Sequence, residues 1–109
     1  MPPLSTVVIN SGSVVSQSVD LTKGQLRVVD VPALTSGDLL LQGAFVDNSA
    51  NFKRLVETRA PGSGDMRFAV GSGSVIVSLP DNYIFPNYVR LETAVAQGGT
   101  RSFSVLTRP

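Results

Sequence analysis

The chain contains no cysteine, no histidine and no tryptophan in its 109 residues. Imidazole and thiolate are the side chains that most readily perform acid–base, nucleophilic or zinc chemistry near neutral pH. Because both are missing, we expect no enzyme activity, no catalytic residue and no cofactor. Without cysteine there is also no disulfide framework, so core packing or assembly must stabilise the fold.

Charged residues are scarce, at 16% of the chain, whereas an average soluble domain has about 25%. The net charge is +1, and the nine basic residues are scattered along the sequence. The densest group, Lys53, Arg54 and Arg59, also contains Glu57, whereas a nucleic-acid site gathers its basic residues in a stripe. We therefore expect no nucleic-acid partner. A neutral surface repels its neighbours less and suits a protein that works in contact with others.

No apolar run approaches the roughly 20 residues of a membrane span. The segment 1–6 has no basic residue, and the apolar run behind it is only Val7-Val8-Ile9. The sequence therefore predicts neither a membrane segment nor a signal peptide.

What the chain does contain is short β-prone runs separated by Gly, Ser, Pro and Asn. Apolar residues alternate with polar ones with a period of two, which is typical of half-buried strands. The length is that of one domain. We predict an all-β fold, a single antiparallel, jelly-roll-like β-sandwich of about nine short strands, in residues 6–109, preceded by an extended arm at 1–5. The strands are expected at 6–10, 15–21, 25–31, 38–46, 52–58, 66–70, 75–79, 88–96 and 100–107.

Four local features refine this prediction. Pro32 should end the strand before it, because proline has no N–H for a ladder. The segment Asp38 to Val46 carries apolar residues on both faces, which indicates a central strand or an edge packed against a partner. Phe52 and Leu55 cannot share a face of a regular strand, so we expect a β-bulge between them. Over 89–97 a helix is the alternative, although β-branched residues and missing caps favour a strand.

No group of residues in the sequence has the pattern of a catalytic, phosphate-binding or metal site. The many serines have no histidine to act as their base, and the aspartates mostly stand at strand ends, where acids cap turns. The glycines of Gly62–Gly64 and Gly71–Gly73 do not have phosphate-loop spacing. Asp47 to Asn51 offers oxygen ligands for calcium, but Ala50 interrupts them, so a turn is the better interpretation and no metal is predicted.

One segment, Asp81 to Tyr88, combines both tyrosines of the chain with a phenylalanine. Exposed tyrosines are typical of interaction hot spots, and such rings also stack on sugars. The alternative is that Ile84, Phe85 and Tyr88 close one end of the sandwich, with Pro86 stiffening the loop. Composition favours this structural interpretation.

Several of these motifs together resemble small all-β structural proteins of tailed bacteriophages. The segment Gly12 to Leu21 is similar to their opening "G-x-x-x-S-x-x-x-D-L" strand, and Val28 to Pro32 to the strand that follows. Leu39 to Asp47 and Asn51 to Leu55 resemble their "L-x-x-Q-x-S-x-D-G-x-x-F-x-x-L" hairpin. The final strands are matched by Tyr88 to Leu91 and by Ser102 to Leu106. The chain departs from the pattern at the central turn, where Asn48 and Ala50 replace an Asp-Gly neighbourhood.

The resemblance implies a virion component without catalytic residues, made in the host cytoplasm and located on the capsid exterior. Its function would be that of a capsid decoration (cement) protein, which bridges major capsid protein subunits and stabilises the shell. Such proteins assemble as homo-oligomers, dimers or trimers, for which the strand Leu39 to Val46 is a candidate contact. The candidate interface residues are Pro2, Pro3, Leu40, Tyr83, Phe85 and Tyr88.

Two other functions stay open. A carbohydrate- or receptor-binding module of a phage head or tail fibre would bind a glycan through Tyr83 and Tyr88, although tryptophan, the strongest stacking residue, is missing. A soluble β domain with an adaptor role in the tail or neck is the second alternative.

Overall fold

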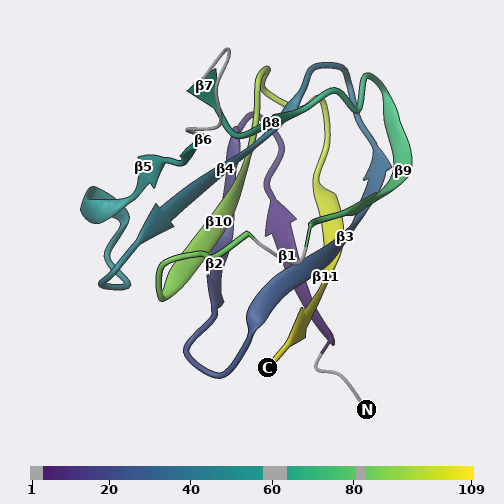
Figure 1. Cartoon of the computed structure of the whole chain (residues 1–109). Coiled ribbons are helices and arrows are strands. Elements are labelled where there is room, and N and C mark those ends of the chain that lie inside the picture. The colour runs from purple at the N-terminus through teal and green to yellow at the C-terminus, as the bar shows by residue number, and fades with distance from the viewer. Residues whose placement is uncertain (1–3, 58–63, 81–82) are drawn as a thin grey trace.

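The computed structural model describes residues 4–57, 64–80 and 83–109. In this part of the chain the fold is all-β: antiparallel strands form one curled sheet with the shape of a half-barrel (Figure 1). The strands are β1 (Leu4–Ile9), β2 (Val15–Asp20), β3 (Gln25–Ala33), β4 (Leu39–Ala44), β5 (Lys53–Arg54), β6 (Val56–Glu57), β7 (Gly64–Asp65), β8 (Arg67–Phe68), β9 (Gly73–Ser78), β10 (Tyr88–Thr93) and β11 (Arg101–Arg108). A short 3-10 helix, η1 (Ser49–Asn51), precedes β5. Among the described residues, no helix has the length and apolarity needed to cross a membrane.

The strand order in the main sheet is β5-β4-β10-β2-β1-β11-β3-β9, and β8 also pairs with β4. β6 and β7 form a separate two-stranded ladder. The two halves of the main sheet join between β1 and β2, where the register holds the single pair Ile9 and Ser16. Beside this pair, the side-chain oxygen of Gln17 accepts a hydrogen bond of 2.8 Å from the N–H of Val8. A side chain thus replaces a ladder bond at the corner of the sheet.

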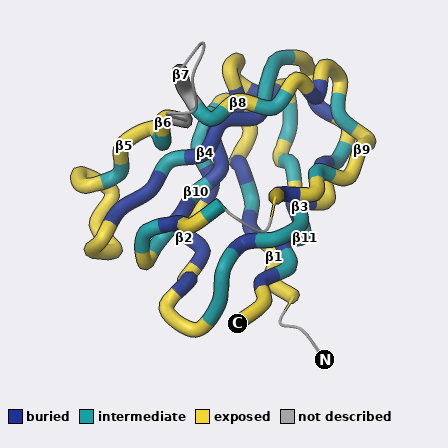
Figure 2. The backbone as a smooth tube through the Cα atoms, in the orientation of Figure 1, coloured by how far each residue is buried: buried dark blue, intermediate teal, exposed yellow. Residues whose placement is uncertain are grey.

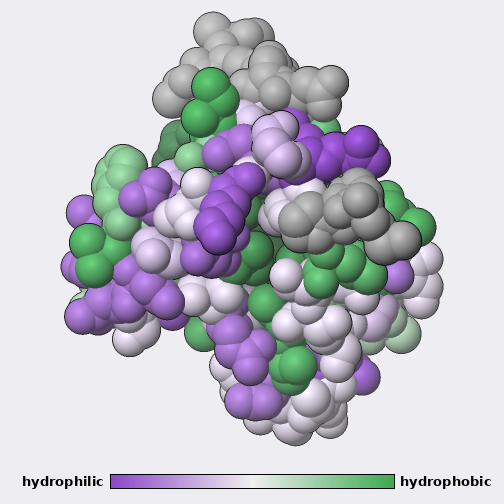
Figure 3. All heavy atoms as spheres, turned by 90° about the horizontal axis from the view of Figure 1, so that it is seen from below, coloured by the Kyte–Doolittle hydropathy of each residue, from purple (hydrophilic) through white to green (hydrophobic). Residues whose placement is uncertain are grey.

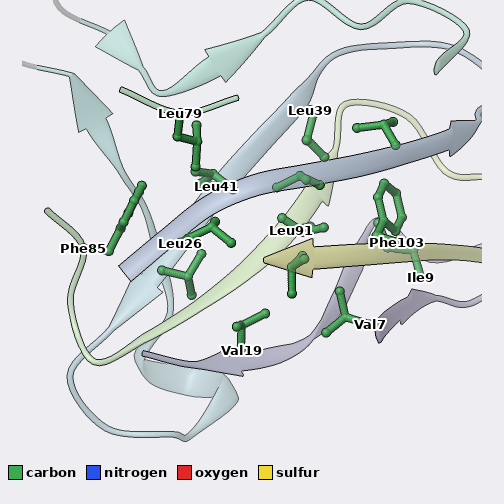
Figure 4. Close-up of a cluster of buried hydrophobic side chains, with 14 of the residues drawn as sticks. Val7, Ile9, Val19, Leu26, Leu39, Leu41, Leu79, Phe85, Leu91 and Phe103 are labelled. Atoms are coloured by element: carbon green, nitrogen blue, oxygen red, sulfur yellow. The ribbon is translucent and has the colours of Figure 1, made fainter. Parts of the chain in front are cut away.

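The core lies on the concave side of the sheet, where apolar residues from both halves meet (Figures 2 and 4). Side chains alternate regularly between the two faces of the sheet. On β10, Val89 and Leu91 are buried in the core cluster, whereas their neighbours Tyr88 and Arg90 point to the other face. The buried cluster comprises Val7, Ile9, Val19, Leu21, Leu26, Val29, Val31, Leu34, Leu39, Leu41, Val70, Leu79, Phe85, Val89, Leu91, Phe103 and Val105.

The segment Leu39–Ala44 is a central strand, which is one of the two arrangements expected from its apolar faces. β4 pairs with β10 along one side and with β5 and β8 along the other. Leu39 and Leu41 belong to the core cluster, and Leu40, on the opposite face, is only 1% exposed.

The prediction of a β-bulge between Phe52 and Leu55 is wrong, because the strand is regular there. Gly43 pairs with Lys53, and the N–H of Leu55 donates to the carbonyl oxygen of Leu41 at 2.9 Å, so the register runs on without a shift. Phe52 faces outward beneath Arg90, whose guanidinium lies 4.6 Å from the ring centroid. Leu55 packs against the core. The two residues therefore occupy opposite faces, as regular alternation requires.

Two strand ends differ from the prediction. β3 continues through Pro32 to Ala33, because β11 pairs with β3 only as far as Asp30 and the ladder to β9 skips Pro32. At that position no partner requires the missing N–H. β10 is a strand that ends at Thr93, so the helical alternative for this segment is wrong.

The sheet also begins earlier than expected. Leu4 and Ser5, assigned to the arm, pair with Leu106 and Val105 of β11. A β11 that runs to Arg108 supplies ladder partners for them, which local composition could not indicate. Residues 1–3, including Pro2 and Pro3, lie outside the described residues, as do 58–63 and the first two residues of the aromatic segment, 81–82.

Candidate functional site

The candidate site is an apolar groove of about 700 Å³ between the β4–β5 hairpin and the loop before β10. One wall comes from the hairpin and the other from Ile84, Phe85 and Pro86. The lining is mainly apolar, with Lys53 and Arg54 as its cationic residues. Such a lining suits an apolar side chain or segment with a carboxylate nearby.

Three large apolar residues stand exposed around this groove: Phe45, Val46 and Ile84, with exposed fractions of 77%, 60% and 86%. We call them the apolar patch. Single exposed apolar residues are normal, but a group that surrounds a groove is typical of an interaction site. On the face of the molecule seen from below, apolar residues lie in several groups among polar ones (Figure 3).

Arg27 of β3 anchors the loop that presents Ile84. Arg27 donates to the carbonyl oxygens of Pro80 and Tyr83, both at 2.7 Å, through its two terminal nitrogens. Because these bonds flank Ile84 on its N-terminal side, the exposed side chain stands on a fixed backbone. A pre-ordered contact loses less entropy on binding.

The same loop is fixed on its C-terminal side. The ring of Phe85 is buried in the core and meets the ring of Tyr83 edge-on, with centroids 6.3 Å apart. Asn87 donates through its side chain to the carbonyl oxygen of Phe45 at 3.3 Å, and accepts from the N–H of Leu21 at 2.7 Å. The Asn87 contact joins the two walls of the groove directly.

Gly43 lines the groove at a point where Pro86 and Leu55 lie close to its backbone. A Cβ at this position would lie 2.6 Å from Cγ of Pro86 and 2.8 Å from Cδ2 of Leu55. Glycine is thus required here for space rather than for its backbone angle. Any side chain would push Pro86 outward and change the groove.

A network of polar side chains lies on the outer face of β4 and β10, next to the groove. The carboxylate of Glu92 accepts from Nη2 of Arg54 at 2.6 Å and from Nε of Arg54 at 3.0 Å. Gln42 donates to the same carboxylate at 2.8 Å and accepts from Nε of Arg90 at 2.6 Å. The Arg54 hydrogen bonds, followed by that of Gln42, lower the pKa of Glu92 against the opposing effect of its burial. The network fixes β5, and with it one wall of the groove, to the centre of the sheet.

The predicted interface residues lie in different environments. Leu40 is buried on the outer face of β4, and Phe85 is buried in the core. Tyr83 is half-buried against the core, and Tyr88 is half-buried on the face of β10 opposite Val89. The two tyrosines are therefore not arranged side by side as one stacking surface. Phe85 closes the end of the core as the structural interpretation expected, but Ile84 points outward.

The predicted turn at Asp47 to Asn51 is present. Asn48 caps the helix η1, and its side-chain oxygen accepts from the N–H of Ala50 at 3.0 Å. This hydrogen bond is that of an Asx turn.

The exposure of Phe45 and Val46 was not predicted from the sequence, because both were assigned to the strand 38–46. The signal that was available is the turn composition directly after Val46, which ends the strand and leaves both side chains beyond its last ladder partner at Ala44.

Comparison with known proteins adds no family assignment: no family model matches the chain, and no curated protein or solved structure is significantly similar to it.

Proposed function

We propose that the protein is a capsid decoration protein that binds the outside of a phage shell through the apolar patch and the groove beside it. The observation that carries the proposal is Ile84, exposed to 86% on a loop anchored by four hydrogen bonds, in which Arg27 and Asn87 donate and Gln25 accepts. A rigid apolar side chain at the surface is typical of a binding hot spot. The resemblance in sequence supplies the class of partner, the major capsid protein.

The mechanism is adhesion. Each copy places Phe45, Val46 and Ile84 against apolar side chains of the capsid, and Lys53 at the rim of the groove attracts a carboxylate there. Many copies on a repeating shell act together, so a modest affinity per copy suffices to stabilise the assembly.

We also propose that the curled sheet is a jelly-roll-like sandwich of two layers. β1, β11, β3 and β9 form one layer, and β2, β10, β4 and β5 form the other layer of a jelly-roll-like sandwich, joined at the Ile9–Ser16 corner. In support, Val29 of the first set and Leu91 of the second are members of one buried cluster.

The test is sedimentation of the purified protein with assembled capsids of the phage that encodes it. We expect the wild type to sediment with the capsids, and Ile84→Ser and Phe45→Ser to stay in the supernatant. Val95→Ser is the matched control, because Val95 is exposed but does not line the groove. Equal binding of all variants would contradict the proposal, as would a wild type that does not bind.

A further inference from the structure

The strand β9 forms an edge of the main sheet (Figure 1). It pairs with β3, and no other strand in the described part of the chain borders it. Its sequence, Gly-Ser-Val-Ile-Val-Ser, contains no charge and no proline. Open edges of this kind pair readily with other strands, and proteins usually block them with lysine, proline or a covering segment.

The open edge of β9 presents the backbone groups of Ile76 and Ser78. Leu79, opposite Arg27 in the register, donates its N–H to the carbonyl oxygen of Arg27 at 2.8 Å. Residues of the same parity, such as Val77, therefore turn their backbone groups toward β3. The N–H and C=O of Ile76 and Ser78 point in the opposite direction, to the open edge.

The side chains of β9 are suited to pairing as well. Val75 and Val77 lie opposite the buried Val31 and Val29, and so face the concave side. Ile76, opposite the exposed Asp30, faces outward and is 69% exposed. Both faces of β9 therefore carry apolar side chains, and the outward face, with Ile76, is exposed to water.

The segment Ser74 to Ser78 reads the same in both directions: Ser-Val-Ile-Val-Ser. In antiparallel pairing with a second copy, a two-fold axis at Ile76 places Ile76 opposite Ile76 and Val75 opposite Val77. It also places serine opposite serine. A shift by two residues would put Ser74 opposite Ile76 and lose this match. The centre of the repeat is also a residue whose backbone groups point to the open edge, so the matched register is a hydrogen-bonded one.

We propose that β9 pairs with β9 of a second copy of this chain, antiparallel and about a two-fold axis at Ile76. The main sheet then continues through both copies, an isologous contact of the kind most common in dimers. Ser74 has a φ of 61°, which bends the start of the strand, and Ser74 is the residue opposite Ser78, so regular pairing covers Val75 to Val77. So short a contact belongs to the small class of interfaces, and the dimer should dissociate on dilution. The dimer is a property of the free protein and does not depend on capsid binding.

The first experiment is sedimentation equilibrium of the purified protein, without capsids, over a range of concentrations. We expect a reversible dimer for the wild type. Ile76→Lys and Ile76→Glu should each raise the dimer Kd at least about tenfold, because like charges then face each other across the axis. An equimolar mixture of the two variants should form a heterodimer, since opposite charges then meet. Ile76 is exposed, so these substitutions leave the fold intact, which circular dichroism checks.

A thiol provides the second experiment. The chain has no cysteine, so Ile76→Cys carries a single thiol. Directly opposite residues of a hydrogen-bonded pair have Cα atoms about 5.5 Å apart, a distance that a disulfide spans. We expect Ile76→Cys to form a covalent dimer under mild oxidation of dilute protein, and the exposed control Val95→Cys to remain monomeric.

Three results would overturn the proposal. One is a wild type that stays monomeric up to millimolar concentration. Another is a dimer that persists in Ile76→Lys, which would place the contact elsewhere. The third is a mixture of the Lys and Glu variants that stays monomeric, because residue 76 would then not face its own copy.

Discussion

The side-chain oxygen of Gln25 accepts a hydrogen bond of 2.7 Å from the backbone N–H of Phe85, 60 residues further along the chain. Gln25 is the first residue of β3, and Phe85 follows the exposed Ile84 directly. Together with Arg27, Gln25 makes the N-terminal end of β3 the support of the loop that presents Ile84. The rigidity of the binding loop thus comes from a strand that does not itself reach the groove.

Gln25→Ala should loosen this support. The N–H of Phe85 would lose its partner, and the loop around Ile84 would sample more conformations before binding. We expect faster amide exchange at Phe85 and several-fold weaker capsid binding, with a loss of about 1 kcal/mol in the free energy of unfolding. Amide exchange followed by NMR, together with capsid sedimentation, measures both effects. Unchanged exchange at Phe85 would show that the hydrogen bond does not order the loop.

Ser16→Ala tests the bulge in β2. Ser16 and Gln17 together lie opposite Leu91 where the register between β2 and β10 shifts, and the hydroxyl oxygen of Ser16 accepts from the N–H of Leu91 at 2.9 Å. Alanine leaves that buried N–H without a partner, which should lower the free energy of unfolding by about 1–3 kcal/mol. Urea unfolding is the measurement. Ser102→Ala, on an exposed position of β11, should change stability by less than about 0.5 kcal/mol.

Alanine substitutions at two glycines distinguish the energetic cost of a left-handed backbone from that of a steric clash. Gly71 and Gly73 both have positive φ, 55° and 83°. A Cβ at Gly71 meets nothing within 4 Å, whereas at Gly73 it would lie 2.0 Å from the carbonyl oxygen of Pro32. Gly71→Ala should cost about 1 kcal/mol, and Gly73→Ala clearly more, because β9 must move away from β3. Equal thermal stabilities of the two variants would contradict this.

The pH dependence of stability should contain a contribution from Glu92. Its pKa is lowered in the folded state by the hydrogen bonds from Arg54, so the unfolded chain binds the proton more tightly. The stabilisation is therefore complete above the unfolded pKa, about 4.3, and is lost as the pH falls through the folded value. Glu92→Gln should be less stable than the wild type at pH 7, and the difference should shrink below pH ~4. Urea unfolding at both pH values checks this. A difference that grows in acid would mean that the ion pair does not stabilise the fold.

The strands were predictable because their signal is local. Alternation by two survives in β2 and β10, where apolar residues alternate with polar ones that face the other side, and turn residues such as Lys23 and Gly24 separate the runs. Pro32 was misjudged for a reason that lies outside its own segment. Whether a proline ends a strand depends on which neighbours require its N–H, and these are known only from the strand order.

The candidate site was less predictable, because it consists of contacts between distant segments. Nothing in the sequence near Arg54 indicates that Glu92, 38 residues later, accepts its hydrogen bonds. The aromatic segment 81–88 was identified as important, yet the exposed apolar residue in its described part, 83–88, is Ile84 rather than either tyrosine. Composition indicates that such a loop matters, whereas contacts with distant residues, such as those of Arg27 and Gln25, determine which side chain it presents.

The most direct test of the proposed function is the temperature at which assembled capsids disrupt, measured by light scattering with and without saturating protein. If the protein stabilises the shell through the apolar patch, the wild type and Val95→Ser raise this temperature, and Ile84→Ser does not. A wild type that leaves the disruption temperature of the shell unchanged would contradict the account.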